Sequence, residues 1–176
     1  MGLVEAMKAL YHVSNNPNLE IDPNHEHRQG EMGKGFYVTT DPRAWRDTLT
    51  GRYVYSVDPR PLRIARGHNY PSHVQLAHWA IERGYMRMAP VVRPATGEVI
   101  RDQAGEPLIR PEVTEAGKRF LWQDPMTGGS IMGLANEYLR EKGFNALEAS
   151  YSPEGQQIII LDPSVVKLKK ITRIPR

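Results

Sequence analysis

Proline and glycine interrupt the chain throughout and prevent any long uninterrupted element. The 14 prolines and 15 glycines are spread rather than clustered, so they separate short strands and helices. The longest apolar run, residues 158–161, is far too short to cross a bilayer. With 176 residues, 40% of them hydrophobic, the chain can bury the core of one medium domain. We therefore expect a single domain, residues 1–176.

Composition excludes several classes of site. The chain has no cysteine, which removes disulfides, thiolate metal sites and cysteine nucleophiles. Residues 1–10 show no basic start followed by a long apolar stretch, so we expect no cleaved secretion signal and a cytoplasmic location. The net charge is +3, and part of the surplus lies in residues 167–176. Apolar residues alternate with those cations. This favours a solvated, slightly basic end of the chain over a surface that binds a polyanion.

Hydrophobic periodicity indicates an α+β fold with more strand than helix. The capping pair Ser72 and Gln75 and the closing Gly84 bound one expected helix. Further helices are expected after Asp41-Pro42, within 112–122 and over 130–142, and hairpins between 91 and 110. The expected strands cover 9–14, 36–40, 53–57, 62–65, 144–149 and 157–161.

Three segments resemble the signatures of a known family, the poly(ADP-ribose) polymerase and diphtheria-toxin-like ADP-ribosyltransferases. LYHVS at 10–14 and GKGFYVTTDPRAW at 33–45 are similar to its first two signatures, a strand ending in His-Gly-Ser or His-Gly-Thr and a later Gly-Lys-Gly-(apolar)-Tyr segment before a helix with a small residue. GQQIIILDP at 155–163 is similar to the third, an apolar strand preceded by glutamate. The interval 67–123 is unmatched. The matching residues are His12, Ser14, Gly33, Lys34, Gly35, Tyr37 and Ala44, with Gln157 at the place of the glutamate.

The resemblance implies a split β-sandwich of two small mixed sheets with flanking helices and an NAD cleft. NAD would be the substrate, with no metal. By resemblance, His12 hydrogen-bonds a ribose hydroxyl, the backbone of Val13 holds the nicotinamide carboxamide, and Tyr37 stacks on the pyridinium ring. Ser14 braces the end of the strand, and Ala44 is the small residue of the following helix. Each of these side chains taken alone is more often structural than functional.

Two positions depart from the family pattern. Val13 replaces the usual glycine, which requires a negative φ and a side chain that points away from nicotinamide. Gln157 replaces the glutamate that contacts the nicotinamide ribose, and a neutral amide can hydrogen-bond a hydroxyl but cannot act as a base. Chain elongation is therefore not expected. Glu154, Glu148 or Gln156 would serve instead if the strand register were shifted.

The expected function is NAD-dependent transfer of one ADP-ribose to a protein or nucleic-acid acceptor, with cleavage of the nicotinamide–ribose bond. Two alternatives remain open. The first is a non-catalytic module of the same fold that binds a nucleotide or a partner. The second is an RNA 2′-phosphotransferase, which would need basic residues around the RNA phosphate. The sequence does not select the acceptor or the biological role, whether toxin, phage modifier or other.

Other motifs predict no site. The loop residues His25 and His27 offer a metal spacing without a third ligand. The segment Gly128-Gly129-Ser130 lacks the Walker lysine and indicates an ordinary helix start.

Overall fold

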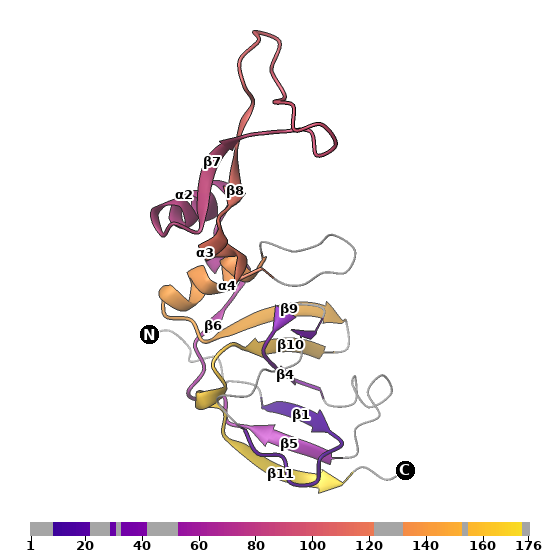
Figure 1. Cartoon of the computed structure of the whole chain (residues 1–176). Coiled ribbons are helices and arrows are strands. Elements are labelled where there is room, and N and C mark those ends of the chain that lie inside the picture. Colours follow the sequence, from indigo (N-terminus) through magenta and orange to yellow (C-terminus); the bar gives the residue numbers. More distant parts are fainter. Residues whose placement is uncertain are drawn as a thin grey trace, which may run out of the picture. The chain divides into compact units, whose positions relative to one another are not determined.

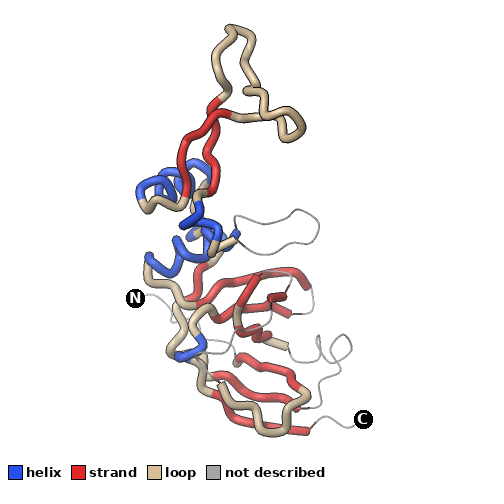
Figure 2. The backbone as a smooth tube through the Cα atoms, viewed as in Figure 1, coloured by secondary structure: helices blue, strands red, loops and turns tan. Residues whose placement is uncertain are grey.

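The computed structural model describes residues 9–21, 29–30, 33–41, 53–121, 132–152 and 155–173, shown in Figures 1 and 2. The chain divides into two compact units. Unit 1 comprises residues 1–70 and 139–176, and unit 2 comprises residues 71–138. We predicted one domain in which 67–123 matches no family signature, and most of that interval lies in unit 2. Within the described ranges, no helix is both long and apolar enough to span a membrane.

Unit 1 is built on a seven-stranded sheet with the order β11-β5-β1-β4-β10-β9-β6. All neighbouring strands run antiparallel except β6 and β9, which are parallel. With the helices described below, the fold is α+β, as the sequence predicted. The strands are β1 (Leu10–Ser14), β4 (Phe36–Thr39), β5 (Tyr53–Val57), β6 (Ile64–Ala65), β9 (Ala146–Ser152), β10 (Gly155–Ile160) and β11 (Leu168–Arg173).

Smaller elements complete unit 1. The strands β2 (Gln29–Gly30) and β3 (Gly33–Lys34) form a separate pair. Short 3-10 turns lie at η1 (Gly67–Asn69) and η2 (Pro163–Val165). The helix expected after Asp41-Pro42 and the segments around His25 and Gly128 fall outside the described residues.

The sheet is almost divided between β1 and β4. Of these two fully described strands, only Tyr11 and Thr39 face each other as a register pair, whereas β1 and β5 pair along all of β1. The two parts, β11-β5-β1 and β4-β10-β9-β6, are therefore joined at one pair. The sequence predicted two packed sheets, whereas the structure places these seven strands in one sheet with a narrow join.

Alternation along the strands gives this sheet two distinct faces. The core face carries the main hydrophobic cluster of unit 1, whose buried members are Leu10, Phe36, Val38, Val57, Leu62, Ala146, Ile158 and Ile160. The side chains between these positions point to what we call the second face. There Val13 and Val54 are buried together, with Tyr11 and Tyr37 packed against them. Both faces therefore exclude water from part of the sheet.

Unit 2 combines short helices with a β-ribbon. It holds α2 (His73–Glu82), β7 (Met86–Pro90), β8 (Ile109–Val113) and α3 (Glu115–Lys118). The helix α4 (Met132–Glu141) begins in unit 2 and ends in unit 1. Beyond β7 and β8 the ribbon continues as loops (Figure 2). Its turns contain Gly97 and Gly105, both at positive φ, as expected for the Thr96-Gly97 and Ala104-Gly105 turn pairs.

An aromatic cluster forms the core of unit 2. The Trp79 ring lies 5.6 Å from Tyr138 in an edge-on arrangement and 5.5 Å from Tyr85. Phe120 meets Tyr85 at 4.8 Å, and the Arg119 guanidinium lies 4.6 Å from the Phe120 ring centroid. Such pairs contribute about 0.5–1.5 kcal/mol each beyond burial. These ring contacts stabilise the core of unit 2, which contains few aliphatic side chains.

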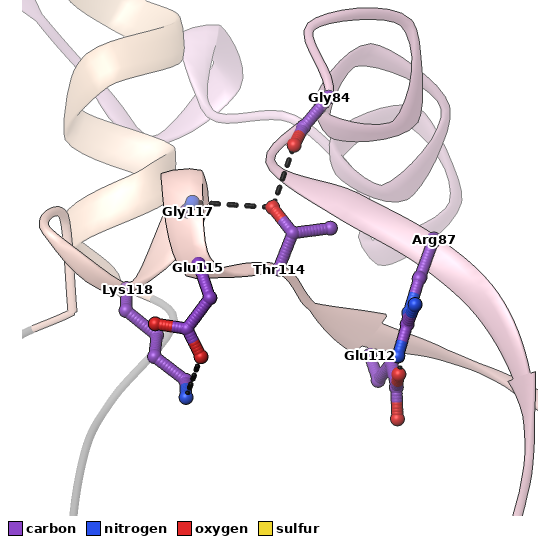
Figure 3. Close-up of polar contacts among 7 residues, drawn as sticks. All are labelled: Gly84, Arg87, Glu112, Thr114, Glu115, Gly117 and Lys118. Atoms are coloured by element: carbon purple, nitrogen blue, oxygen red, sulfur yellow. Dashed lines mark hydrogen bonds and ion pairs between the residues drawn. The ribbon is translucent and has the colours of Figure 1, made fainter.

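Polar contacts fix the junction of α2, β7, β8 and α3 (Figure 3). The Thr114 hydroxyl donates to the Gly84 carbonyl oxygen at 2.6 Å and accepts from the Gly117 amide at 3.3 Å. Arg87 and Glu112 form an ion pair across the ribbon at 2.7 Å.

The expected α2 capping box is present, with Ser72 Oγ accepting from the Gln75 amide, so the local signals for this helix are confirmed.

Gly35 is a position where the sheet of unit 1 leaves no room for a side chain. A Cβ at Gly35 would lie 2.3 Å from Ile159 Cγ2 and 3.0 Å from the Ile160 carbonyl oxygen, whereas Gly67 has nothing within 4 Å. We expect Gly35→Ala to lower the free energy of unfolding by about 1–3 kcal/mol, the usual cost of overpacking. Chemical denaturation followed by circular dichroism measures this, with Gly67→Ala as the matched control. Equal stability of the two variants would contradict the packing at Gly35.

Candidate functional site

The three segments singled out from the sequence lie side by side in unit 1. LYHVS forms β1, FYVT forms β4, and the apolar segment from Gly155 forms β10. In the sheet β4 lies between β1 and β10 (Figure 1). Segments separated by more than a hundred residues in the sequence are thus brought onto three consecutive strands.

His12 connects β1 to β4 across the narrow join of the sheet. Its Nδ1 lies 2.7 Å from the carbonyl oxygen of Tyr37, and its ring stacks on Phe36 with centroids 4.2 Å apart. A carbonyl oxygen only accepts hydrogen bonds, so Nδ1 carries the hydrogen. In the neutral ring, Nε2 is then the acceptor nitrogen.

Tyr37 and His12 present their rings to opposite faces of the sheet. His12 stacks on Phe36, which belongs to the core face. The Tyr37 ring packs against the cluster of Val13 and Val54 on the second face, because successive side chains of a strand alternate. The group of Tyr37 that contacts His12 is therefore its backbone carbonyl. Side-chain spacing in the sequence did not reveal this arrangement.

Gln157 lies on the same face as Tyr37. It pairs with Thr39 in the β10–β4 register, one diagonal step from Tyr37, and such diagonal neighbours are about 7–8 Å apart. A register irregularity follows Gly155 in β10, and bulges of this kind redirect side chains near functional sites. Glu148 pairs with Ile158 and so lies on the opposite face from Gln157.

The remaining predicted residues have varied placements. The Ser14 hydroxyl accepts from the Asn16 amide at 3.0 Å, which caps the end of β1. Val13 meets the requirement for a negative φ, since no described non-glycine residue has a positive φ. Its side chain nevertheless packs on the face that holds Tyr37. Glu148 is bound to Arg66 at 3.0 Å. Ala44 and Glu154 lie outside the described residues.

A groove that the sequence did not predict lies beside these strands. Its volume is about 510 Å³, and it is lined by β1, β5, β11 and the loops at their ends. Tyr11 and Ser56 lie on its wall, and Arg60, Lys167 and Lys169 supply its cations. The basic tail was visible in the sequence, but its pairing with β5 was not, because it depends on contacts between residues more than a hundred positions apart.

No protein-family model, curated protein or solved structure matches the chain. The geometry of unit 1 is therefore the basis for a functional proposal. Across the described ranges, no group of three or more His, Asp or Glu side chains is arranged to hold a metal ion. His73 and His78 both lie on α2, five positions apart, and residues at this spacing do not face each other on a helix.

We expect His12 to exist as the Nδ1–H tautomer when neutral. The Tyr37 carbonyl oxygen at 2.7 Å requires a donor at Nδ1. Long-range ¹H–¹⁵N correlation NMR at a pH of about 9, where an imidazole is neutral, distinguishes protonated from unprotonated ring nitrogens. The exposed His73 on α2 is the internal control. An Nε2–H tautomer at His12 would contradict the observed hydrogen bond.

Proposed function

We propose that unit 1 has an ADP-ribosyltransferase-like fold, binds NAD and transfers a single ADP-ribose to an acceptor. The observation that carries the proposal is the juxtaposition of β1, β4 and β10, each of which bears one of the three family-like segments. The narrow join between β1 and β4 at Tyr11 and Thr39 supports it further, since the family fold has a split β-structure.

Tyr37 and Gln157 supply the centre of the proposed site. Both lie on the second face, one diagonal step apart in the β4–β10 register. That separation, about 7–8 Å, lets one bound dinucleotide reach both side chains. Tyr37 stacks on the nicotinamide ring, whose positive charge favours an aromatic face. Val13 packs on the same face, so the pocket is narrower than one with glycine at that position.

His12 has a positioning role in this proposal. Its Nδ1–H holds the Tyr37 backbone and thereby positions the strand that carries the stacking ring. Its own ring stacks on Phe36 on the core face, opposite to Tyr37 and Gln157, so the ribose contact that the resemblance implies is not part of the proposed site. Fixing both strands before NAD binds lowers the cost of orienting the substrate.

The reaction breaks the bond between the ribose C1′ and the nicotinamide nitrogen. The bonding electrons go to the pyridinium nitrogen, which leaves as neutral nicotinamide, and positive charge develops on the ribose. A lone pair of the acceptor then forms the new bond to C1′, and the acceptor proton passes to solvent. Gln157 can hydrogen-bond a ribose hydroxyl but cannot take the proton. We therefore expect slow turnover and no chain elongation.

A second candidate function is NAD binding without turnover. The neutral Gln157 favours it, because an amide does not stabilise a developing cation as a carboxylate does. Both candidates use the same residues and differ only in nicotinamide release.

Nicotinamide release from NAD tests this function. We expect slow release by the wild-type protein, a loss of about tenfold in Tyr37→Ala when roughly 1.4 kcal/mol of stacking is removed, and near-normal release in Tyr37→Phe. Gln157→Glu restores a carboxylate and should raise release by about tenfold or more. Liquid chromatography of free nicotinamide measures all four proteins.

The controls for this experiment are folding and binding. Circular dichroism must show that each variant is folded, because Tyr37 also packs against Val13 and Val54. An NAD-induced thermal shift without release would select the non-catalytic function. Absence of both release and thermal shift in wild type and in Gln157→Glu would overturn the NAD proposal.

A further inference from the structure

The groove of unit 1 combines a positively charged rim with a largely apolar floor. Arg60, Lys167 and Lys169 face a single carboxylate in the groove, that of Asp58. The apolar lining of the groove includes Tyr11, Pro59 and Ile171. A volume of about 510 Å³ is within the range of sites that hold a small organic group. The matching occupant has a flat apolar part and adjacent negative charges.

Asp58 orients the Arg60 side chain, and its single negative charge leaves the groove lining with a net positive charge. Arg60 Nε donates to Asp58 Oδ1 at 2.9 Å, and Nη2 donates to Oδ2 at 2.7 Å. This contact holds the pKa of Asp58 at about 2, so the pair stays ionised at neutral pH. The Arg60 side chain is 84% exposed, and its other three N–H bonds are directed away from Asp58.

The two lysines of the rim are held in register by β5. The Asp58 amide donates to the Lys167 carbonyl oxygen at 3.1 Å, and the Ser56 hydroxyl donates to the Lys169 carbonyl oxygen at 3.3 Å. Lys167 directly precedes β11 and Lys169 lies within it, and residues two apart in extended backbone are about 7 Å apart. This separation is comparable to that of successive phosphates in an extended nucleic-acid strand.

The groove and the proposed NAD site lie on the same face of the sheet and are related by the sheet register, with the buried Thr39 between them. Lys169 pairs with Ser56, Ser56 with Tyr11, Tyr11 with Thr39, and Thr39 with Gln157. All five residues therefore lie in one row across the sheet. Tyr11, on the groove wall, is two strand spacings from Gln157, about 10 Å. The groove and the proposed NAD site are therefore neighbours on this face, which is the condition for a bound strand to act as the acceptor.

We propose that this groove binds a single-stranded nucleic acid and that this strand is the ADP-ribose acceptor. Phosphates contact Arg60, Lys167 and Lys169, and an unpaired base lies against Tyr11 and the apolar floor, as in stacking sites for single strands. A duplex hides its base faces and does not fit this floor. The acceptor role rests on the proposed NAD-dependent function, whereas the binding role does not.

Binding of a fluorescein-labelled, mixed-sequence DNA oligonucleotide, followed by fluorescence anisotropy, tests the groove directly. Three phosphate contacts predict a slope of about −2 for the logarithm of the association constant against the logarithm of salt concentration. The double variant Lys167→Glu/Lys169→Glu should bind about tenfold more weakly or worse, and the magnitude of its salt slope should fall by about 1 to 2. Arg63→Glu/Lys142→Glu makes the same charge change at exposed positions of unit 1 outside the groove and should bind like wild type.

The outcomes of this experiment separate the groove from general electrostatics and from other partners. Equal weakening in both double variants would overturn the groove as the binding site, and so would the absence of oligonucleotide binding by the wild type. Tighter binding of the duplex form, or displacement of the oligonucleotide by polyglutamate at equal charge concentration, would assign the groove to a duplex or to an acidic protein and overturn the proposal.

Transfer of labelled ADP-ribose from NAD to the oligonucleotide tests the acceptor role. We expect labelling by Gln157→Glu and its loss by about tenfold when Lys167→Glu/Lys169→Glu is added, with nicotinamide release in the absence of oligonucleotide unchanged. Nicotinamide release without any labelling of the bound oligonucleotide would overturn the acceptor role alone. If the NAD reaction itself fails, no nicotinamide is released, while fluorescence anisotropy still measures oligonucleotide binding to the groove.

Discussion

The contact between β1 and β4 is the constraint on which the arrangement of unit 1 depends. One register pair, Tyr11 with Thr39, joins the two parts of the sheet, and the His12 side chain adds a hydrogen bond to the Tyr37 carbonyl oxygen. A histidine is suited to this place because its flat ring stacks on Phe36 while its edge donates a hydrogen bond. The position of Tyr37 relative to β1 therefore follows from the His12 contact.

The same join would let the proposed dinucleotide site and the proposed acceptor site share one sheet. Tyr37 and Gln157 lie on the β4–β10 side, and the basic groove lies on the β11–β5–β1 side. The register row through Tyr11 and the buried Thr39 relates the two. In the proposed reaction the neutral Gln157 would give slow chemistry, and binding of the acceptor close to the ribose would provide much of the rate through proximity.

Local signals in the sequence predicted local structure well. The capping residues of α2 and the positive φ of Gly84 appear where helix-end chemistry places them. Most strands of the sheet were also expected. Non-local features could not be predicted from the sequence, because the β1–β4 pair and the β5–β11 register depend on packing between segments far apart in the chain. The opposite faces of the His12 and Tyr37 rings and the division into two units belong to this class.

Saturation-transfer difference NMR with NAD tests the central claim, that the second face beside Tyr37 binds the nicotinamide end of NAD. We expect the strongest saturation transfer at the nicotinamide ring protons, retained in Tyr37→Phe and lost in a folded Tyr37→Ala protein. Saturation transfer confined to the adenine protons, or unchanged in Tyr37→Ala, would contradict this claim.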